Sequence, residues 1–331
     1  MARAARLRAS LRGLACAALM CVSVAQAAPM RTLPGAMIEA EPQFSLEILD
    51  HGGPLTVSGA VHGLFTMPGR RMTLDARDVP ASADLVLDTG GLEPPERVTA
   101  HRWRWRAPNR PGMYVLTLRN RATGGTMYLN VFVKTPLDPT QAMLNGYDIG
   151  HYQPLPEDRD PTYARPGGLV RVTPEIAHAQ VSPHFELSDF LCHQQPDHWP
   201  KYVLVRPRLV AKLEAVRSAL RDGGVPVEKL TVMSGYRTPW YNADIGNDTV
   251  YSRHLYGGAA DIFVDTDEDG EMDDLNADGR VDIEDARWLA DLVETVTARR
   301  SALAGGLSAY AANGYHGPFV HMDVRGVAVR W

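Results

Sequence analysis

The feature that most constrains the fold is a change of hydrophobic period partway along the chain. Between residues 44 and 136 apolar residues alternate with polar ones, as at Phe44, Leu46 and Ile48, and Gly and Pro interrupt the runs. Alternation is typical of half-buried β-strands. About seven short strands in roughly 95 residues are typical of an immunoglobulin-like sandwich. We therefore expect an all-β immunoglobulin-like domain over residues 44–136, serving as a spacer or adaptor.

The second half of the chain carries helical periodicity between strand-like runs. Leu209, Leu213, Val216 and Leu220 recur at helical spacing after a proline, and residues 286–299 predict a second helix. Strand-like runs lie on both sides of each helix. This pattern predicts an α+β domain over residues 181–331, one antiparallel sheet with helices packed on it. A Pro- and Gly-rich linker is expected over residues 137–180.

The N-terminus has the pattern of an export signal. Four arginines precede an apolar run from Leu14 to Ala25, and Ala25-Gln26-Ala27 is typical of a cleavage site. The apolar run is too short to span a bilayer. We expect a signal peptide over residues 1–27, a leader over 28–43, and a periplasmic or secreted protein with no transmembrane span after cleavage. An uncleaved anchor is the alternative.

Cysteine usage and charge exclude several classes. Of the three cysteines only Cys192 follows the signal peptide, so no internal disulfide is expected, and its apolar neighbours predict a packing role. The formal net charge is −5 and no arginine-rich stripe is present. The chain therefore lacks the basic surface that nucleic-acid binding requires.

Two histidines and an aspartate have a spacing that suits a metal. His254 is followed seven positions later by Asp261, with glycines and alanines between them, and His321 comes sixty residues after Asp261. Catalytic zinc commonly takes three protein ligands of these types and keeps a fourth position open for water. The spacing alone is weak, because a chain with 11 His offers such patterns by accident.

Several motifs occur in the order seen in one family. They are Ser234-Gly235-Tyr236-Arg237-Thr238-Pro239, Tyr241-Asn242, the stretch 252–261 and Phe319-Val320-His321-Met322-Asp323. Over residues 180–331 the chain resembles the zinc D-Ala-D-Ala peptidase family, the LAS group of murein peptidases, in its periplasmic C-terminal-domain form. The resemblance implies a LAS-type zinc peptidase domain, with His254, Asp261 and His321 as zinc ligands. It also implies cleavage of amide bonds in peptidoglycan stem peptides or cross-links, by endopeptidase or carboxypeptidase action.

The chain departs from this family at the general base. Many relatives have Glu three residues before the last histidine, where this chain has Pro318. Asp323 shares a strand face with His321 and is the first candidate for base and acid; its alternative role is to fix an imidazole. His316 is a second candidate.

The resemblance also implies roles in binding substrate. Arg237 corresponds to the family arginine that holds substrate or the developing oxyanion. Ser252 is expected to hydrogen-bond substrate, and Tyr236 to pack beneath the site. Loss of the glutamate leaves open a second function, a catalytically inactive cell-wall binding protein that keeps its metal site. An amidase that cleaves the sugar–peptide link is a further alternative.

An acidic insert over residues 265–285 predicts a second cation. It contains two overlapping frames that resemble calcium loops of the EF-hand and dockerin kind. The oxygen ligands in these frames are Asp265, Asp267, Asp269, Asp273 and Asn276, and then Asp274, Asn276, Asp278, Asp282 and Asp285. Val281 occupies the position where such loops place a core-facing hydrophobe. We expect structural calcium here; a solvated acidic loop is the alternative.

Overall fold

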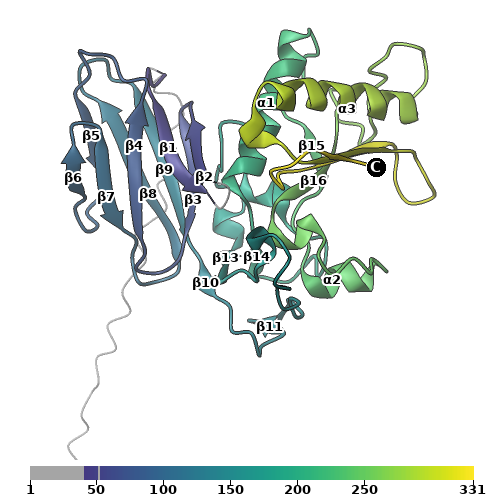
Figure 1. Ribbon diagram of the computed structural model, residues 1–331, viewed down its shortest axis with the longest axis horizontal. Coiled ribbons are helices and arrows are strands. Elements are labelled where there is room, and N and C mark those ends of the chain that lie inside the picture. Colours follow the sequence, from purple (N-terminus) through teal and green to yellow (C-terminus); the bar gives the residue numbers. More distant parts are fainter. Residues whose placement is uncertain (1–40, 51–52) are drawn as a thin grey trace, which may run out of the picture. The chain divides into compact units, whose positions relative to one another are not determined.

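The computed structural model describes residues 41–50 and 53–331 (Figure 1). The predicted signal peptide over residues 1–27 and most of the predicted leader over 28–43 lie outside the described residues. Among the helices of the described residues, none is both long and apolar enough to cross a membrane.

The first part of the described chain consists of nine strands. Their bounds are β1 (Ser45–Asp50), β2 (Gly53–Val57), β3 (Val61–Thr66), β4 (Arg71–Arg77), β5 (Leu85–Asp88), β6 (Glu96–Thr99), β7 (Arg102–Arg106), β8 (Gly112–Asn120) and β9 (Thr126–Val133). One sheet has the order β2-β1-β4-β7-β6 and the other the order β3-β9-β8-β5. Their strand pairs are antiparallel except for β3 with β9, which is parallel.

Alternating apolar residues explain why these segments form strands. Leu46 and Ile48 of β1 are buried, as are Trp103 and Trp105 of β7, while the arginine between the two indoles is exposed. One face of β1 and one face of β7 therefore contribute to a core, and the two indoles are core residues. The strands and sheets agree with the expected β-rich region, and the immunoglobulin-like arrangement stays a prediction.

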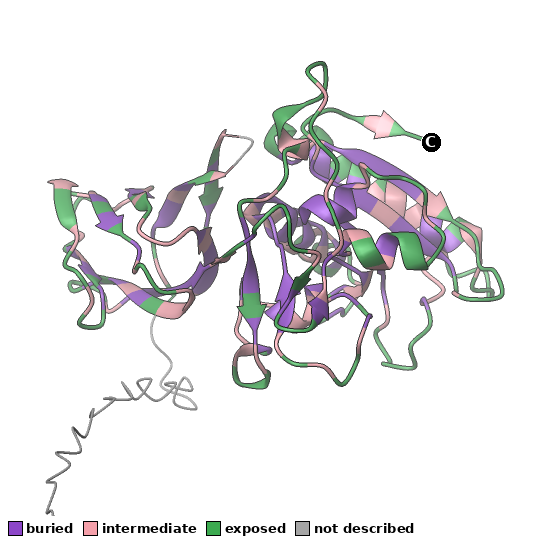
Figure 2. Ribbon diagram, turned by 90° about the horizontal axis from the view of Figure 1, so that it is seen from below, coloured by how far each residue is buried: buried purple, intermediate pink, exposed green. Residues whose placement is uncertain are grey.

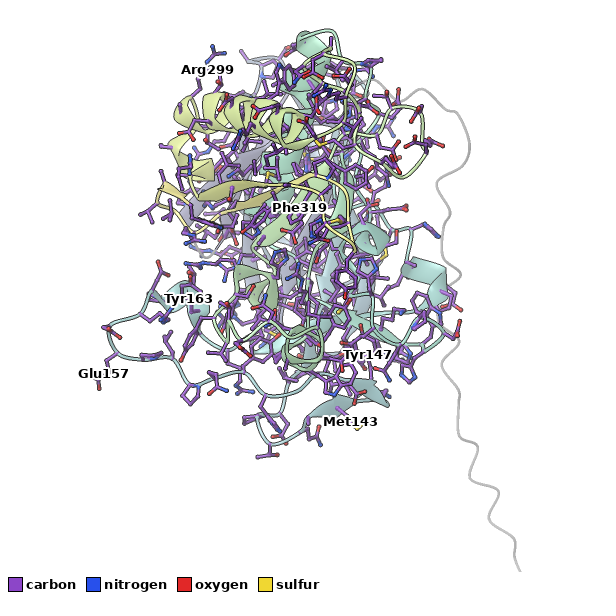
Figure 3. The ribbon with its side chains drawn as sticks, turned by 90° about the vertical axis from the view of Figure 1, so that its right-hand side faces the viewer. Met143, Tyr147, Glu157, Tyr163, Arg299 and Phe319 are labelled. Atoms are coloured by element: carbon purple, nitrogen blue, oxygen red, sulfur yellow. The ribbon has the colours of Figure 1, made fainter. Side chains whose placement is uncertain are left out.

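The segment after β9 contains short elements. They are β10 (Thr135–Pro136), β11 (Met143–Leu144), β12 (Tyr147–Asp148) and the 3-10 helix η1 (Pro161–Tyr163), then β13 (Gly168–Val172) and η2 (Pro174–Ile176). Met143 and Tyr147, labelled in Figure 3, lie on the paired strands β11 and β12. The Tyr152 hydroxyl lies 2.7 Å from that of Tyr236, so this segment is fastened to the region that carries the Ser-Gly-Tyr-Arg motif.

The C-terminal part supplies the remaining elements. These are η3 (Leu187–Phe190), β14 (Lys201–Val203), α1 (Pro207–Asp222), β15 (Thr231–Ser234), α2 (Pro239–Asp244), η4 (Arg253–Tyr256), β16 (Ala259–Phe263), α3 (Ile283–Ala298), η5 (Ser301–Leu303), β17 (Gly306–Tyr310), β18 (Phe319–Asp323) and β19 (Val329–Arg330). The main sheet has the order β15-β16-β18-β17-β19. It is antiparallel except for β17 with β19.

The helices lie on both sides of this sheet. In Figure 1, α1 and α3 lie on one side of β15 and β16, and α2 lies on the other. Helix α3 contacts β17, β18 and α1. The inner strand β16 is buried throughout, as are most residues of the central strand β18 (Figure 2). This mixed α and β architecture agrees with the predicted peptidase fold.

Local signals set the ends of the helices. Helix α1 begins at Pro207 and is followed by Gly223, as the sequence predicted. Helix α3 begins at Ile283, three residues before the predicted start. The reason is a capping box, in which Asp282 accepts from the Glu284 N–H and Asp285 accepts from the Asp282 N–H. The acidic insert therefore leads directly into α3.

Candidate metal centre

Three elements bring His254, Asp261 and His321 together. His254 lies on η4, Asp261 on β16 and His321 on β18, and Asp261 pairs directly with His321 across the antiparallel ladder. Directly paired residues project from the same face of a sheet. Gly257 ends η4 with a φ of 63° and turns the chain into β16. A Cβ at Gly257 would lie 2.4 Å from the Leu204 carbonyl oxygen, so only glycine fits this turn.

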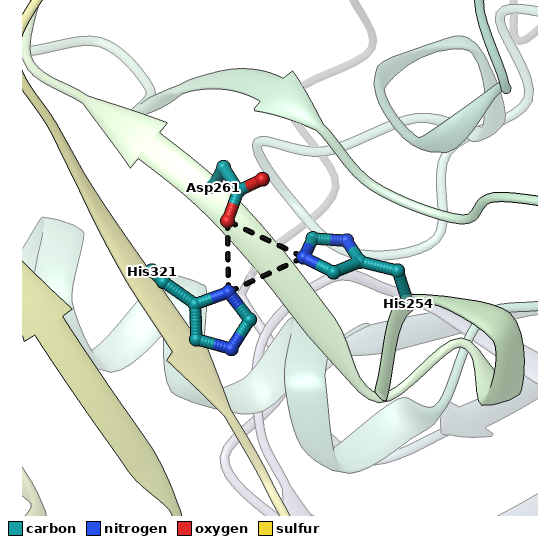
Figure 4. A group of neighbouring side chains, drawn as sticks. All are labelled: His254, Asp261 and His321. Carbon is teal, nitrogen blue, oxygen red and sulfur yellow. Dashed lines mark hydrogen bonds and ion pairs between the residues drawn. The ribbon is translucent and has the colours of Figure 1, made fainter. Parts of the chain in front are cut away.

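The donor atoms of the three side chains converge on one point (Figure 4). His321 Nδ1 lies 2.8 Å from Asp261 Oδ1, and His254 Nε2 lies 3.2 Å from His321 Nδ1 and 3.3 Å from Asp261 Oδ1. Ligands around a tetrahedral zinc ion, with bonds near 2.1 Å, lie about 3.4 Å apart. The two imidazoles and the carboxylate therefore fit zinc in kind and in spacing.

The opposite atoms of two of these side chains are held by hydrogen bonds. His254 Nδ1 donates to the Gly235 carbonyl at 2.6 Å, which leaves the Nε2 lone pair directed at the cluster. Asp261 Oδ2 accepts from Arg237 Nη2 at 2.5 Å, which leaves Oδ1 for the cluster. A Cβ at Gly235 would lie 2.8 Å from Phe190 Cα, so this glycine permits the close approach. Such supporting contacts fix ring orientation and tautomer in metal sites.

The surroundings of His254 and Asp261 keep both side chains in the protonation states that can bind a metal. Burial lowers the pKa of His254, which keeps the imidazole neutral. Burial alone would raise the pKa of Asp261, but the adjacent imidazoles of His254 and His321 outweigh it and hold that pKa well below its usual range. A metal binds neutral imidazole and ionised carboxylate, so these are the protonation states that a zinc site needs.

Asp323 lies behind His321 with no access to solvent. Its side chain is fully buried, and it accepts from the Gly306 N–H and from the Arg325 guanidinium. Its Oδ2 lies 3.6 Å from His321 Nε2. Burial would raise the pKa of Asp323, yet the contacts with His321 and Arg325 lower it. A buried, paired carboxylate cannot reach a substrate proton, so the geometry favours the alternative role of fixing the imidazole.

Arg237 is engaged with a candidate ligand. Its Nη2 donates to Asp261 and its Nε donates to Ser234 Oγ at 2.8 Å. The side chain is 14% exposed. Its position therefore orients the Asp261 carboxylate and leaves little of its surface for a substrate.

The other predicted site residues are spread around the cluster. His316 is in the exposed loop before β18, where its Nδ1 donates to the Gly317 carbonyl and its ring meets Phe319 edge to face. Ser252 is the residue before η4, with a backbone carbonyl that accepts from the Leu255 N–H. Tyr236 is fully buried and hydrogen-bonded to Tyr152, a packing position that does not expose it to substrate.

The sequence analysis missed an aromatic residue beside the cluster. The ring of Trp331 lies with its centroid 5.4 Å from that of His321, and its Nε1 donates to the Tyr310 hydroxyl at 2.7 Å. Trp331 is 55% exposed. An aromatic residue at the end of a predicted strand is a weak signal, because only the parallel pairing of β17 with β19 carries the chain back beside this sheet.

The acidic insert folds into two turns of the same design. Asp265 accepts from the N–H groups of residues 269 and 270, and Asp274 accepts from those of residues 278 and 279. Positive φ also repeats at a spacing of nine residues, at Glu268 and Gly270 and again at Ala277 and Gly279. The overlapping frames read from the sequence are therefore present as repeated backbone conformations.

The two turns differ in their acidic side chains. Ligand atoms of Asp265, Asp267 and Asp269 lie within 4.8 Å of one another. In the second turn Asp285 is fully buried and accepts from the N–H groups of residues 275, 276 and 282, so it braces the loop and caps α3. The expectation of a core-facing Val281 is wrong, because Val281 is 43% exposed, and Met272 in the first turn is the buried hydrophobe.

Comparison with known proteins supports the family resemblance. Residues 183–279 match the Peptidase M15 family, which is the zinc D-Ala-D-Ala peptidase family that the motifs indicated. Neither a curated protein nor a solved structure matches the chain. The matched segment contains His254 and Asp261 and ends before His321, so the third donor is assigned from its strand pairing with Asp261.

Proposed function

We propose that this chain is an exported zinc metallopeptidase that cleaves amide bonds in peptidoglycan stem peptides or cross-links. The Peptidase M15 match supports a zinc-dependent hydrolase acting on peptides related to peptidoglycan. The observation that carries the proposal is the convergence of His254, Asp261 and His321, with donor atoms 2.8 to 3.3 Å apart. We take the 44–136 region as an immunoglobulin-like spacer and residues 181–331 as the catalytic domain, joined by the 137–180 linker.

The three donors would hold the zinc ion, and nearby groups would keep them in place. Zinc supplies a Lewis acid that polarises a scissile carbonyl and lowers the pKa of water towards 7. Gly235 and Arg237 fix the donors from outside, and Asp323 holds the His321 ring through its buried negative charge. Arg237 thus acts on the reaction through Asp261.

His316 is the candidate that we propose for proton transfer. It is partly exposed, its Nδ1 donates to the Gly317 carbonyl, and its Nε2 accepts from Asn313 Nδ2 at 2.8 Å, so Nε2 carries the lone pair that a proton transfer would use. Asp323, by contrast, is fully buried. Replacement of His316 by Ala should remove the acidic limb of the kcat profile against pH, and replacement by Gln should not restore it. An unchanged pH profile would mean that a group other than His316 is the general base.

Turnover of defined muropeptides, followed by mass spectrometry of the products, tests the peptidase proposal. The zinc-loaded protein should release fragments that His254→Ala does not, and the masses separate endopeptidase, carboxypeptidase and amidase cleavage. If the wild-type protein binds zinc and muropeptides but its products match those of His254→Ala, the second proposal takes its place, an inactive cell-wall binding protein. The replacement of the usual glutamate by Pro318 favours that alternative.

We also propose that the first acidic turn binds structural calcium. The proposal is supported by the convergence of Asp265, Asp267 and Asp269 and by the repeated turn geometry. Carboxylates this close repel one another without a cation, and oxygen ligands at alternate positions suit calcium. Calcium would brace the chain where it leaves β16, directly after the Asp261 strand.

Export rests on the N-terminal pattern over residues 1–27. Expression of the full chain in a bacterial host, with N-terminal sequencing of the mature product, tests it. A start at Ala28 in the periplasm or medium is expected, and retention of the apolar run would indicate an anchor.

A further inference from the structure

The 3-10 helix that carries His254 is held in place by a segment far away in sequence. Helix η4 has only four residues, and the hydrogen bonds of a 3-10 turn have poorer geometry than those of an α-helix. Helix η1 contacts η4, although 91 positions separate Thr162 from Arg253. The position of His254 therefore depends on these tertiary contacts as well as on η4 itself.

Arg253, the residue before His254, is a buried cation whose guanidinium faces a tyrosine ring. It is 6% exposed, and its Cζ lies 3.5 Å from the centroid of the Tyr163 ring. Its Nη1 donates to Thr162 Oγ1 at 2.5 Å, and its Nε has no hydrogen-bond partner. A guanidinium out of water gains more from an aromatic face than an exposed one does. The Tyr163 ring is therefore a principal partner of this buried charge.

The same ring also packs against the other end of η4. The centroid of Tyr163, which is labelled in Figure 3, lies 5.4 Å from that of Tyr256 in an edge-to-face contact. Tyr256 is the last residue of η4 and is 1% exposed. Arg253 is the first residue of η4. One side chain thus contacts both ends of the short helix in which His254 lies.

A second connection between η1 and η4 does not involve the Tyr163 side chain. Arg206 Nη2 donates to the Thr162 carbonyl at 2.5 Å, and Arg206 Nε donates to the Tyr256 carbonyl at 2.8 Å. Both acceptors are backbone atoms, so these bonds are still possible when Tyr163 is replaced. An effect of that replacement can therefore be assigned to the ring.

We propose that Tyr163, acting through Arg253, is a positioning residue for the zinc ligand His254. The inference rests on the proposed metal centre, since it concerns how one ligand of that centre is held. Without the ring, η4 is free to shift, and His254 Nε2 then moves away from its place beside Asp261 Oδ1. Loss of a residue that supports a ligand directly costs roughly 10–100-fold in metal affinity, and Tyr163 is one contact further out, so we expect about tenfold.

Zinc affinity of the full chain, measured by competition with a chelator, tests the proposal without any turnover. Tyr163→Leu should raise the zinc dissociation constant about tenfold. Tyr163→Phe keeps the ring face and should stay within about twofold of the wild type. Tyr114→Leu is the matched control, because Tyr114 is also half-buried but lies on β8. The control should leave zinc affinity unchanged, whatever it does to the melting temperature.

A double-mutant cycle tests the route through Arg253. Arg253→Met should weaken zinc binding about as much as Tyr163→Leu, and the double variant should be no weaker than either, because both changes remove one contact. Additive losses would overturn the proposal. Far-UV circular dichroism checks that each variant folds, and comparison of Arg253→Met with the wild type carries the test if Tyr163→Leu does not fold.

His254→Ala separates this inference from the proposed metal centre. If His254→Ala loses zinc while Tyr163→Leu binds it like the wild type, the positioning role is overturned and the metal centre stands. If His254→Ala binds zinc as tightly as the wild type, His254 is not a ligand, and both proposals are overturned.

Discussion

The metal centre and the acidic insert are both groups of candidate ligands, and they are built in opposite ways. At the metal centre the donors are largely buried and supported from behind by Gly235 and Arg237. In the insert the carboxylates of Asp267 and Asp269 are exposed, and that of Asp269 accepts from the backbone N–H of Glu271 in the same loop. The first arrangement comes from the sheet and would persist without an ion. The second is local, so we expect its order to depend on a cation.

The strongest test of this difference is to remove one ligand from the metal centre. Replacement of Asp261 by Asn should abolish turnover and lower zinc affinity by more than the roughly 10–100-fold that loss of a supporting residue costs. Far-UV circular dichroism should stay unchanged, because the sheet positions the site. Elemental analysis after dialysis measures bound zinc. Retention of full zinc by Asp261→Asn would contradict the assignment of this carboxylate as a ligand.

Acid would protonate ligands in both regions. It would also protonate a buried histidine that belongs to neither region. Burial lowers the pKa of His62 on β3 to about 4, from 6.5. Between these values the unfolded chain binds a proton that the folded chain does not, so stability falls as the pH drops from 6.5 to 4. The loss reaches about 3 kcal/mol. Urea unfolding across this range measures it, and His62→Gln should flatten the curve. A variant curve as steep as the wild type would assign the loss to other groups.

Calcium should separate the two regions by stability. At a hundredfold excess over its Kd, calcium should raise the free energy of unfolding of the zinc-loaded protein by about 2.7 kcal/mol. Thermal melts at fixed zinc, with and without calcium, measure the shift. The double replacement Asp267→Asn with Asp269→Asn should remove it. The matched control, Glu268→Gln with Glu271→Gln, removes the same number of charges but leaves Asp265, Asp267 and Asp269 unchanged. It should therefore keep the calcium-dependent shift. Identical melting temperatures with and without calcium would indicate that the insert is a solvated acidic loop and binds no calcium.

The smallest expected effect concerns the tryptophan beside His321. Replacement of Trp331 by Ala removes a ring that packs at 5.4 Å and should raise KM and the zinc dissociation constant about threefold each. Trp331→Phe keeps an aromatic contact and should lie near the wild type. Isothermal titration with zinc and steady-state kinetics measure the two quantities. An effect beyond a hundredfold would give this ring a larger role than packing.

Much of the site could be predicted because it depends on short motifs. The stretch from His254 to Asp261 identifies two donors, and the Phe-Val-His-Met-Asp run identifies the third as part of a strand. The strand pairing that joins the last two is a property of the fold. Helix α1 was predicted because proline and glycine mark its two ends, whereas the start of α3 depends on a capping contact that hydrophobic spacing does not reveal.

The sequence does not show which of two chemically similar side chains is buried in the fold. Asp323 and Asp267 are both carboxylates near predicted ligands, yet one is fully buried against Arg325 and the other is exposed. Likewise Val281 and Met272 hold equivalent positions in the two turns, and only Met272 enters the core. Burial depends on which elements pack over a residue, and that is decided by contacts distant in sequence.

The direct pairing of Asp261 with His321 has a consequence for biosynthesis. Asp261 emerges from the ribosome well before His321, because the acidic insert and α3 are synthesised between them. A nascent or prematurely terminated chain that lacks β18 carries two of the three donors and has no complete centre. The order of translation thus leaves the proposed metal centre incomplete until β18 has been made.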